Sequence, residues 1–172
     1  MKILSRYVDS ASLKTYYSSY ILPLMDYCCI IWGRSRNHNV EQVAKLQKRA
    51  ARLILRADIT TSSKDMFKSL KWMSFRDRIE YHTCVMVYKT LNNLTPEYIT
   101  DLLSNVSNSH SQQLRSETRN MLRIPRSHTA SFDNSFSVTG PSAWNKLPID
   151  VKSSPSLAAF KDSLTRHIFS QT

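Results

Sequence analysis

Two glycines, Gly33 and Gly140, are all that this chain of 172 residues contains. Glycine adopts positive φ without steric cost, and the tight turns of antiparallel sheets depend on that freedom. A chain with so few glycines lacks many of the turns that an all-β fold requires. Its hydrophobic content of 41% is nevertheless sufficient for a core. The sequence therefore predicts a mainly α-helical protein.

The first helical pattern begins at Ser12, after which apolar residues recur at steps of three or four. Its expected inner face comprises Leu13, Tyr17, Tyr20, Leu24, Cys28 and Ile31. Pro23 falls inside the pattern and removes a backbone hydrogen bond, so we expect a kink or two helices that meet near Leu22. Gly33 is expected to close the segment.

Later segments carry further helical signals. We expect helices over 40–56, around Met66, over 75–91 and over 97–103, and a final helix with an apolar stripe. That stripe is Leu157, Phe160, Leu164 and Ile168. Capping boxes are predicted at the pairs Ser62 with Asp65 and Ser74 with Asp77, while Ser154 and Pro155 are expected to begin the last helix.

Composition divides the chain into three parts. Residues 1–103 form a helical region, and residues 104–120 are rich in Ser, Asn and Gln, which is typical of a polar linker. Residues 121–172 are expected to form a small C-terminal unit. In that unit the runs "LRI" and "SFSV" suggest a short β-hairpin, followed by a one-turn helix around Trp144 and the final amphipathic helix.

Charge points to a polyanionic partner. The chain has 24 Lys and Arg against 13 Asp and Glu, which gives a net charge of +11. On the predicted helix 40–56, Val43, Leu46, Ala50, Leu53 and Ile54 lie on one side. The opposite side carries the candidate nucleic-acid-binding residues Lys45, Lys48, Arg49, Arg52 and Arg56. A solvated helix face is the alternative interpretation.

The apolar run Tyr20 to Trp32 is too short to span a bilayer and contains Asp26, so no membrane role is expected. The N-terminus lacks the apolar core of a signal peptide, and three cysteines form no disulfide framework, so we expect an intracellular location, nucleus or cytoplasm.

Metal, cofactor and catalytic signals are weak. Cys28 and Cys29 point about 100° apart on a helix, and neither they nor Cys84 has the spacing of a zinc site. Both adjacent cysteines are therefore expected to pack in the core. No phosphate-binding loop, dinucleotide motif or paired carboxylates occur, so no metal, cofactor, small-molecule substrate or catalytic residue is predicted. Binding is the function that remains.

Three stretches stand in a characteristic order: "LPLMDYCCIIWG" (22–33), "LQKRAARLI" (46–54) and "GPSAWNKLP" (140–148). They resemble the C-terminal portion of the reverse transcriptase of non-LTR, LINE-type retrotransposons of the Jockey-like group. The resemblance implies that the first stretch belongs to a helical thumb and that the catalytic palm would lie upstream of Met1. It also implies partners, namely RNA or an RNA/DNA hybrid held by its backbone, and other parts of a retrotransposon polyprotein.

The expected function is thus that of a non-catalytic reverse transcriptase fragment that binds phosphate backbones. Three alternatives stay open: a helical protein-interaction module whose C-terminal stripe docks on a partner, a sequence-specific DNA-binding protein, and a truncated relic without function. Binding that is insensitive to salt would favour the interaction module.

One prediction concerns catalysis. Because the acids are scattered, the purified chain should not extend a primer on a template in the presence of nucleotides and Mg²⁺. A gel-based extension assay checks this, and incorporation that is abolished by replacing an acid of this chain would contradict it.

Overall fold

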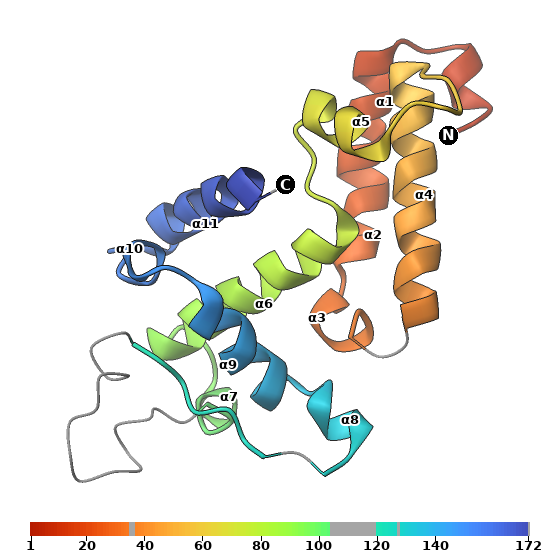
Figure 1. The fold of residues 1–172 in the computed structure, drawn as a ribbon. Helices are drawn as coiled ribbons and strands as arrows, with labels where there is room; N and C mark the ends of the chain where they lie inside the picture. The colour runs from red at the N-terminus through yellow and green to blue at the C-terminus, as the bar shows by residue number, and fades with distance from the viewer. Residues whose placement is uncertain (35–36, 104–119, 127, 172) are drawn as a thin grey trace, which may run out of the picture. The chain divides into compact units, whose positions relative to one another are not determined.

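A computed structural model describes residues 1–34, 37–103, 120–126 and 128–171 (Figure 1). The chain is mainly α-helical, as predicted, and its described residues include no strand. The helices are α1 (Ser10–Tyr16), α2 (Leu22–Asp26), α3 (Cys29–Trp32), α4 (Asn37–Leu55), α5 (Ser63–Leu70), α6 (Phe75–Leu91), α7 (Glu97–Thr100), α8 (Ala130–Asp133), α9 (Phe136–Lys146), α10 (Ile149–Lys152) and α11 (Leu157–Gln171). None of these is long and apolar enough to cross a membrane.

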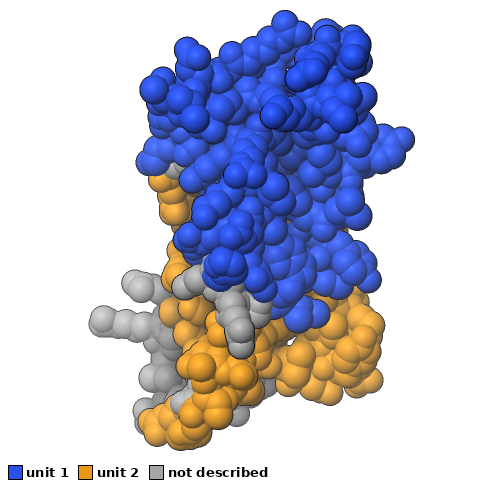
Figure 2. Space-filling model, turned by 90° about the vertical axis from the view of Figure 1, so that its right-hand side faces the viewer, with its two compact units in different colours: residues 1–79, 172 blue, residues 80–171 orange. Residues whose placement is uncertain are grey.

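The described chain forms two compact units, 1–79 and 80–171, which Figure 2 colours separately. The boundary falls within α6, whereas the sequence placed a boundary after residue 103. The later part of α6 belongs to the second unit because it packs there: Tyr88 of α6 stacks on Phe160 of α11 with ring centroids 4.3 Å apart. Most of the predicted linker, residues 104–119, lies outside the described residues.

In the first unit a π-helical turn, Tyr17–Ile21, joins α1 directly to α2. The turn ends at Ile21, two residues before Pro23, which lies in the first turn of α2, so the predicted junction near Leu22 is confirmed. A π turn holds one residue more than an α turn, so the side chains after it point in directions rotated about the helix axis. From Ile21, the last residue of the turn, the inward positions follow four residues apart: Ile21 is half-buried, and Met25 and Cys29 are buried.

This rotation overturns part of the predicted inner face. Leu13 and Tyr17 are buried as expected, but Tyr20, Leu24 and Ile31 are 67%, 77% and 75% exposed. A uniform period of 3.6 residues cannot reveal the extra residue of a π turn. The outer side of this segment is consequently apolar.

Cys28 is also exposed, which corrects the prediction that both adjacent cysteines are packed. It separates α2 from α3 with a left-handed backbone, at φ 50°, whereas Cys29 is 1% exposed. Gly33 closes α3, as predicted. A Cβ atom at Gly33 would lie 2.7 Å from Cδ1 of Ile79, so glycine also permits close packing there.

An ion pair joins α2 to the first turn of α6 inside the first unit. Arg78 donates from Nε to Oδ1 of Asp26 at 2.8 Å and from a terminal nitrogen to the other carboxylate oxygen. Both side chains are about one-fifth exposed, at 20% and 19%. Burial alone would lower the pKa of Arg78, but the hydrogen bond and charge of Asp26 raise it, so the guanidinium stays charged.

Aromatic rings pack beside this ion pair in the same unit. Tyr17 stacks on Trp72 at 4.2 Å, and its hydroxyl lies 3.5 Å from Sδ of Met25. Burial raises the pKa of Tyr17 to about 12. Trp72 is partly buried and packs against the core of the first unit.

Residues of the stretch "GPSAWNKLP" make packing contacts and hydrogen bonds in the second unit. A Cβ atom at Gly140 would lie 3.2 Å from Cγ2 of Val87, so glycine lets α9 lie close to α6. Asn145 binds the backbone of Leu122 twice: its Nδ2 donates to the carbonyl at 2.8 Å, and its Oδ1 accepts from the amide at 2.9 Å. Trp144 donates to the carbonyl of Asn120.

Two local predictions in this region were wrong. The run "SFSV" opens helix α9 instead of forming a hairpin strand, and "LRI" is extended without a described partner strand. Helix α11 begins at Leu157, and the hydroxyl of Ser156, not that of Ser154, accepts from the amide of Ala159. The capping box of Ser74 and Asp77 is confirmed by reciprocal hydrogen bonds between side chains and amides.

The two adjacent cysteines provide a matched stability test. Cys29→Ala should lower the free energy of unfolding by about 1 to 2 kcal/mol, because it removes a buried sulfur and leaves a cavity. Cys28→Ala should change it by less than about 0.5 kcal/mol, because the side chain is exposed. Urea denaturation followed by circular dichroism measures both, and equal costs would contradict the rotated register.

Candidate nucleic-acid interface

Positive charge is concentrated in the first unit. Residues 1–79 contain 15 Lys and Arg against 6 Asp and Glu, a net charge of +9. The remainder of the chain contains 9 Lys and Arg against 7 Asp and Glu, so it contributes only +2 to the total net charge of +11. A site for a polyanion is therefore most favourable on the first unit.

Helix α4 places three cations on its exposed side. Each residue advances about 100° around a helix, so residues seven apart, such as Val40, Gln47 and Ile54, share one side. These three are at most 3% exposed, and α4 packs on α1 and α5. Lys45 and Arg49 are exposed on the opposite side, and Lys48 is exposed about 100° around the helix from Gln47. We name these three residues the α4 cation face.

The inner side of α4 differs in part from the prediction. Ala50 and Ile54 are buried and Val43 and Leu53 are half-buried, but Leu46 is 58% exposed. Gln47 occupies the inner position instead, where its Nε2 donates to the carbonyl of Met73 at 2.9 Å. A buried glutamine is not recognisable from an apolar pattern, because its hydrogen-bond partner lies 26 residues away.

Arg52 has a structural role inside the unit. Its side chain is half-buried, and its guanidinium donates to the carbonyls of Asp58 and Ile59 at 3.2 and 3.3 Å. It thereby holds the loop that follows α4. Arg56 lies just beyond the helix, with φ 51°, and is exposed. Of the five predicted binding residues, α4 thus presents three together.

Other cations of the first unit also fall into two groups, those paired within the unit and those that are exposed. Arg78 is paired with Asp26, and the exposed Arg76 lies 3.3 Å from Glu41. Exposed pairs of this second kind stabilise little and can exchange their partner. Lys64 and Lys68 are exposed on α5, which packs against α4, and add positive charge to the unit.

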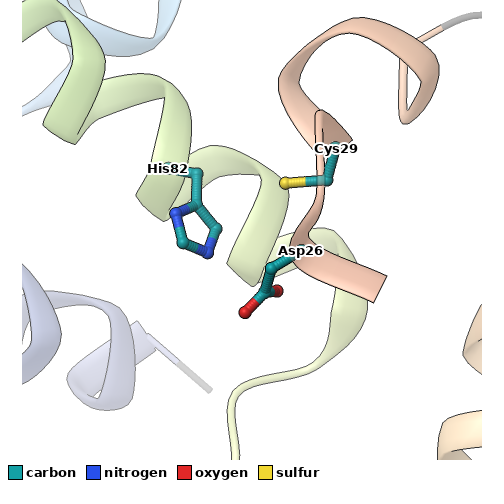
Figure 3. Close-up of side chains that lie close together, drawn as sticks. All are labelled: Asp26, Cys29 and His82. Carbon is teal, nitrogen blue, oxygen red and sulfur yellow. The ribbon is translucent and has the colours of Figure 1, made fainter. Parts of the chain in front are cut away.

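Figure 3 draws three side chains of metal-ligating types: Asp26 at the end of α2, Cys29 at the start of α3, and His82 on α6. His82 belongs to the second unit, so the first unit supplies only a carboxylate and a thiol. The carboxylate is engaged by Arg78, and burial, with the charge of Asp26, raises the pKa of the Cys29 thiol to about 11. Two ligands do not make a zinc site, which takes three or four from the protein.

Comparison with family models, with curated proteins and with solved structures found no match to this chain. The relationship to non-LTR reverse transcriptases therefore stays a prediction.

The distinction between structural and surface cations can be measured. Arg52→Ala should lower the free energy of unfolding by about 1 kcal/mol or more, because two loop carbonyls lose a charged donor. Lys48→Ala is the control on the same helix and should change it by less than about 0.5 kcal/mol. Thermal or urea unfolding measures both values. An Arg52→Ala variant with an unchanged free energy of unfolding would show that the hydrogen bonds of Arg52 to the loop do not stabilise the unit.

Proposed function

We propose that the first unit binds nucleic acid through the phosphate backbone, and that the α4 cation face makes the contact. The observation that carries this proposal is the exposure of Lys45, Lys48 and Arg49 together on α4, away from its buried residues, in a unit of net charge +9. Each cation that meets a phosphate releases condensed counterions, which favours binding with little sequence preference.

The resemblance supports RNA or an RNA/DNA hybrid as the polyanion. Lysine and arginine side chains on an exposed helix can contact phosphates without reading bases, which suits a partner recognised by backbone and shape. This is what holding a template during reverse transcription requires of a non-catalytic element.

The rival interaction module lacks the surface that the sequence assigned to it. Phe160 and Leu164 are fully buried and Ile168 is 9% exposed, within the second unit. Leu157 is half-buried, so most of the C-terminal stripe packs in the core of its own unit, which argues against its use as a docking surface.

Salt dependence tests the proposal. In the full chain, Lys45→Glu, Lys48→Glu and Arg49→Glu together should weaken RNA binding and reduce the slope of log affinity against log salt by roughly 0.7 to 0.9 per lost contact. Folding should survive, because the positions are exposed and glutamate favours helix. Arg52 is left intact, since it stabilises the loop after α4.

A matched control changes the total charge equally in the other unit. Arg123, Arg126 and Lys146 are exposed there, and their replacement by glutamate should leave affinity and slope close to those of the parent. Fluorescence anisotropy with labelled RNA at several salt concentrations measures both quantities. An equal loss of RNA affinity in the two triple variants would show that only overall charge matters and would contradict the assignment of binding to α4.

A further inference from the structure

Two further exposed cations of the first unit lie around the 3₁₀ helix Leu4–Arg6, which precedes α1. The chain is turned on both sides of this short helix, because the amide of Ser5 donates to the carbonyl of Met1 at 2.9 Å and the amide of Val8 donates to that of Leu4 at 3.1 Å. Met1 and Val8 pack against the core of the unit. These contacts anchor the segment to the unit.

The exposed side chains of this segment combine charge with apolar surface. Lys2 and Arg6 are exposed, and each is followed directly by an exposed apolar side chain. Ile3 is 76% exposed and Tyr7 is 81% exposed. None of these four side chains forms a hydrogen bond, an ion pair or a ring contact with the residues that the structure describes. We name the four residues the Tyr7 face.

The Tyr7 face carries positive charge of its own. The nearest acid in the sequence is Asp9, whose carboxylate caps α1 by accepting from the amide of Ser12 at 3.1 Å. Local charge therefore favours an anion. The same segment offers an aromatic ring, on which a nucleobase stacks, and two cations, which contact phosphates.

We propose that the Tyr7 face binds an unpaired nucleotide of single-stranded RNA: the base stacks on Tyr7, and Lys2 and Arg6 contact the adjoining phosphates. This inference rests on the proposed function, because it assumes that the first unit binds nucleic acid. It adds a preference for single strands that phosphate contacts on α4 do not provide. In a duplex or hybrid the faces of the bases are covered by their neighbours, so a protein ring stacks on bases that are unpaired.

The composition of the Tyr7 face sets the expected effect and the preferred ligand. Tyr7 is its one aromatic ring, so one stacked base is expected, and its loss should cost roughly tenfold in affinity. A lipid surface fits less well. Even a single myristoyl chain gives only marginal membrane binding, and the side chains of Ile3 and Tyr7 together offer fewer apolar carbons.

The test uses the full chain with two labelled probes, a single-stranded RNA of about 12 nucleotides and the same strand paired with complementary DNA. Tyr7→Ser should weaken binding to the single strand roughly tenfold and leave binding to the hybrid unchanged. Tyr7→Phe should keep the affinity of the parent because it keeps the ring. Fluorescence anisotropy at several salt concentrations should give the same salt slope for Tyr7→Ser as for the parent, since stacking releases no counterions.

The cations and the ring are separated by further variants and probes. Lys2→Glu with Arg6→Glu should reduce the salt slope for the single strand by roughly 0.7 per lost phosphate contact. A single strand with abasic sugars should bind the parent and Tyr7→Ser equally, because it offers no base to stack. Tyr98 provides the matched control: it lies in the second unit, is 69% exposed, and its replacement by serine should leave both affinities unchanged.

Failure of this inference is distinguishable from failure of the proposed function. If the triple glutamate variant of the α4 cation face loses affinity but Tyr7→Ser binds the single strand as the parent does, the inference alone is overturned. A parent that binds neither probe would overturn both. Equal losses on the two probes for Tyr7→Ser would also overturn the inference, because Tyr7 would not select unpaired bases. So would co-sedimentation of the parent with phosphatidylserine vesicles that Tyr7→Ser abolishes, which would make a lipid surface the ligand.

Discussion

The π turn between α1 and α2 is the constraint on which the first unit depends. One additional residue in the turn Tyr17–Ile21 rotates the rest of the segment, so that Met25 and Cys29 face inward. The same rotation turns Tyr20 and Leu24 outward. Core packing and the exposure of these apolar side chains are thus two consequences of a single backbone irregularity.

Cations of the first unit serve two different purposes. Arg78 pairs with a partly buried carboxylate, and Arg52 donates to two loop carbonyls, so both are used to hold the unit together. Arginine suits such positions because its planar guanidinium offers several donors in fixed directions. Lys45 and Lys48 form no hydrogen bond or ion pair with the residues that the structure describes, and their exposure makes them suitable for phosphate contacts. Charge count alone does not separate these roles.

The second unit uses its amphipathic helix differently from what the sequence suggested. An apolar stripe such as that of α11 fits a partner groove and an internal core equally well. Here Phe160 lies against Tyr88 and Trp144, with ring centroids 4.3 and 5.8 Å apart. The stripe is therefore internal, and the exposed apolar surface occurs on the first unit, where the sequence predicted core.

By itself the sequence determined the helical class, the existence of α4, α5, α6 and α11, and the break near Pro23, because these follow from local periodicity and from the geometry of proline. It also identified the cations of α4. Only tertiary structure decided which of them are exposed, because the hydrogen bonds of Arg52 depend on where the loop after α4 returns. The register beyond the π turn was likewise decided by packing, since inward Met25 and Cys29 and the Asp26 ion pair select a turn that local spacing does not encode.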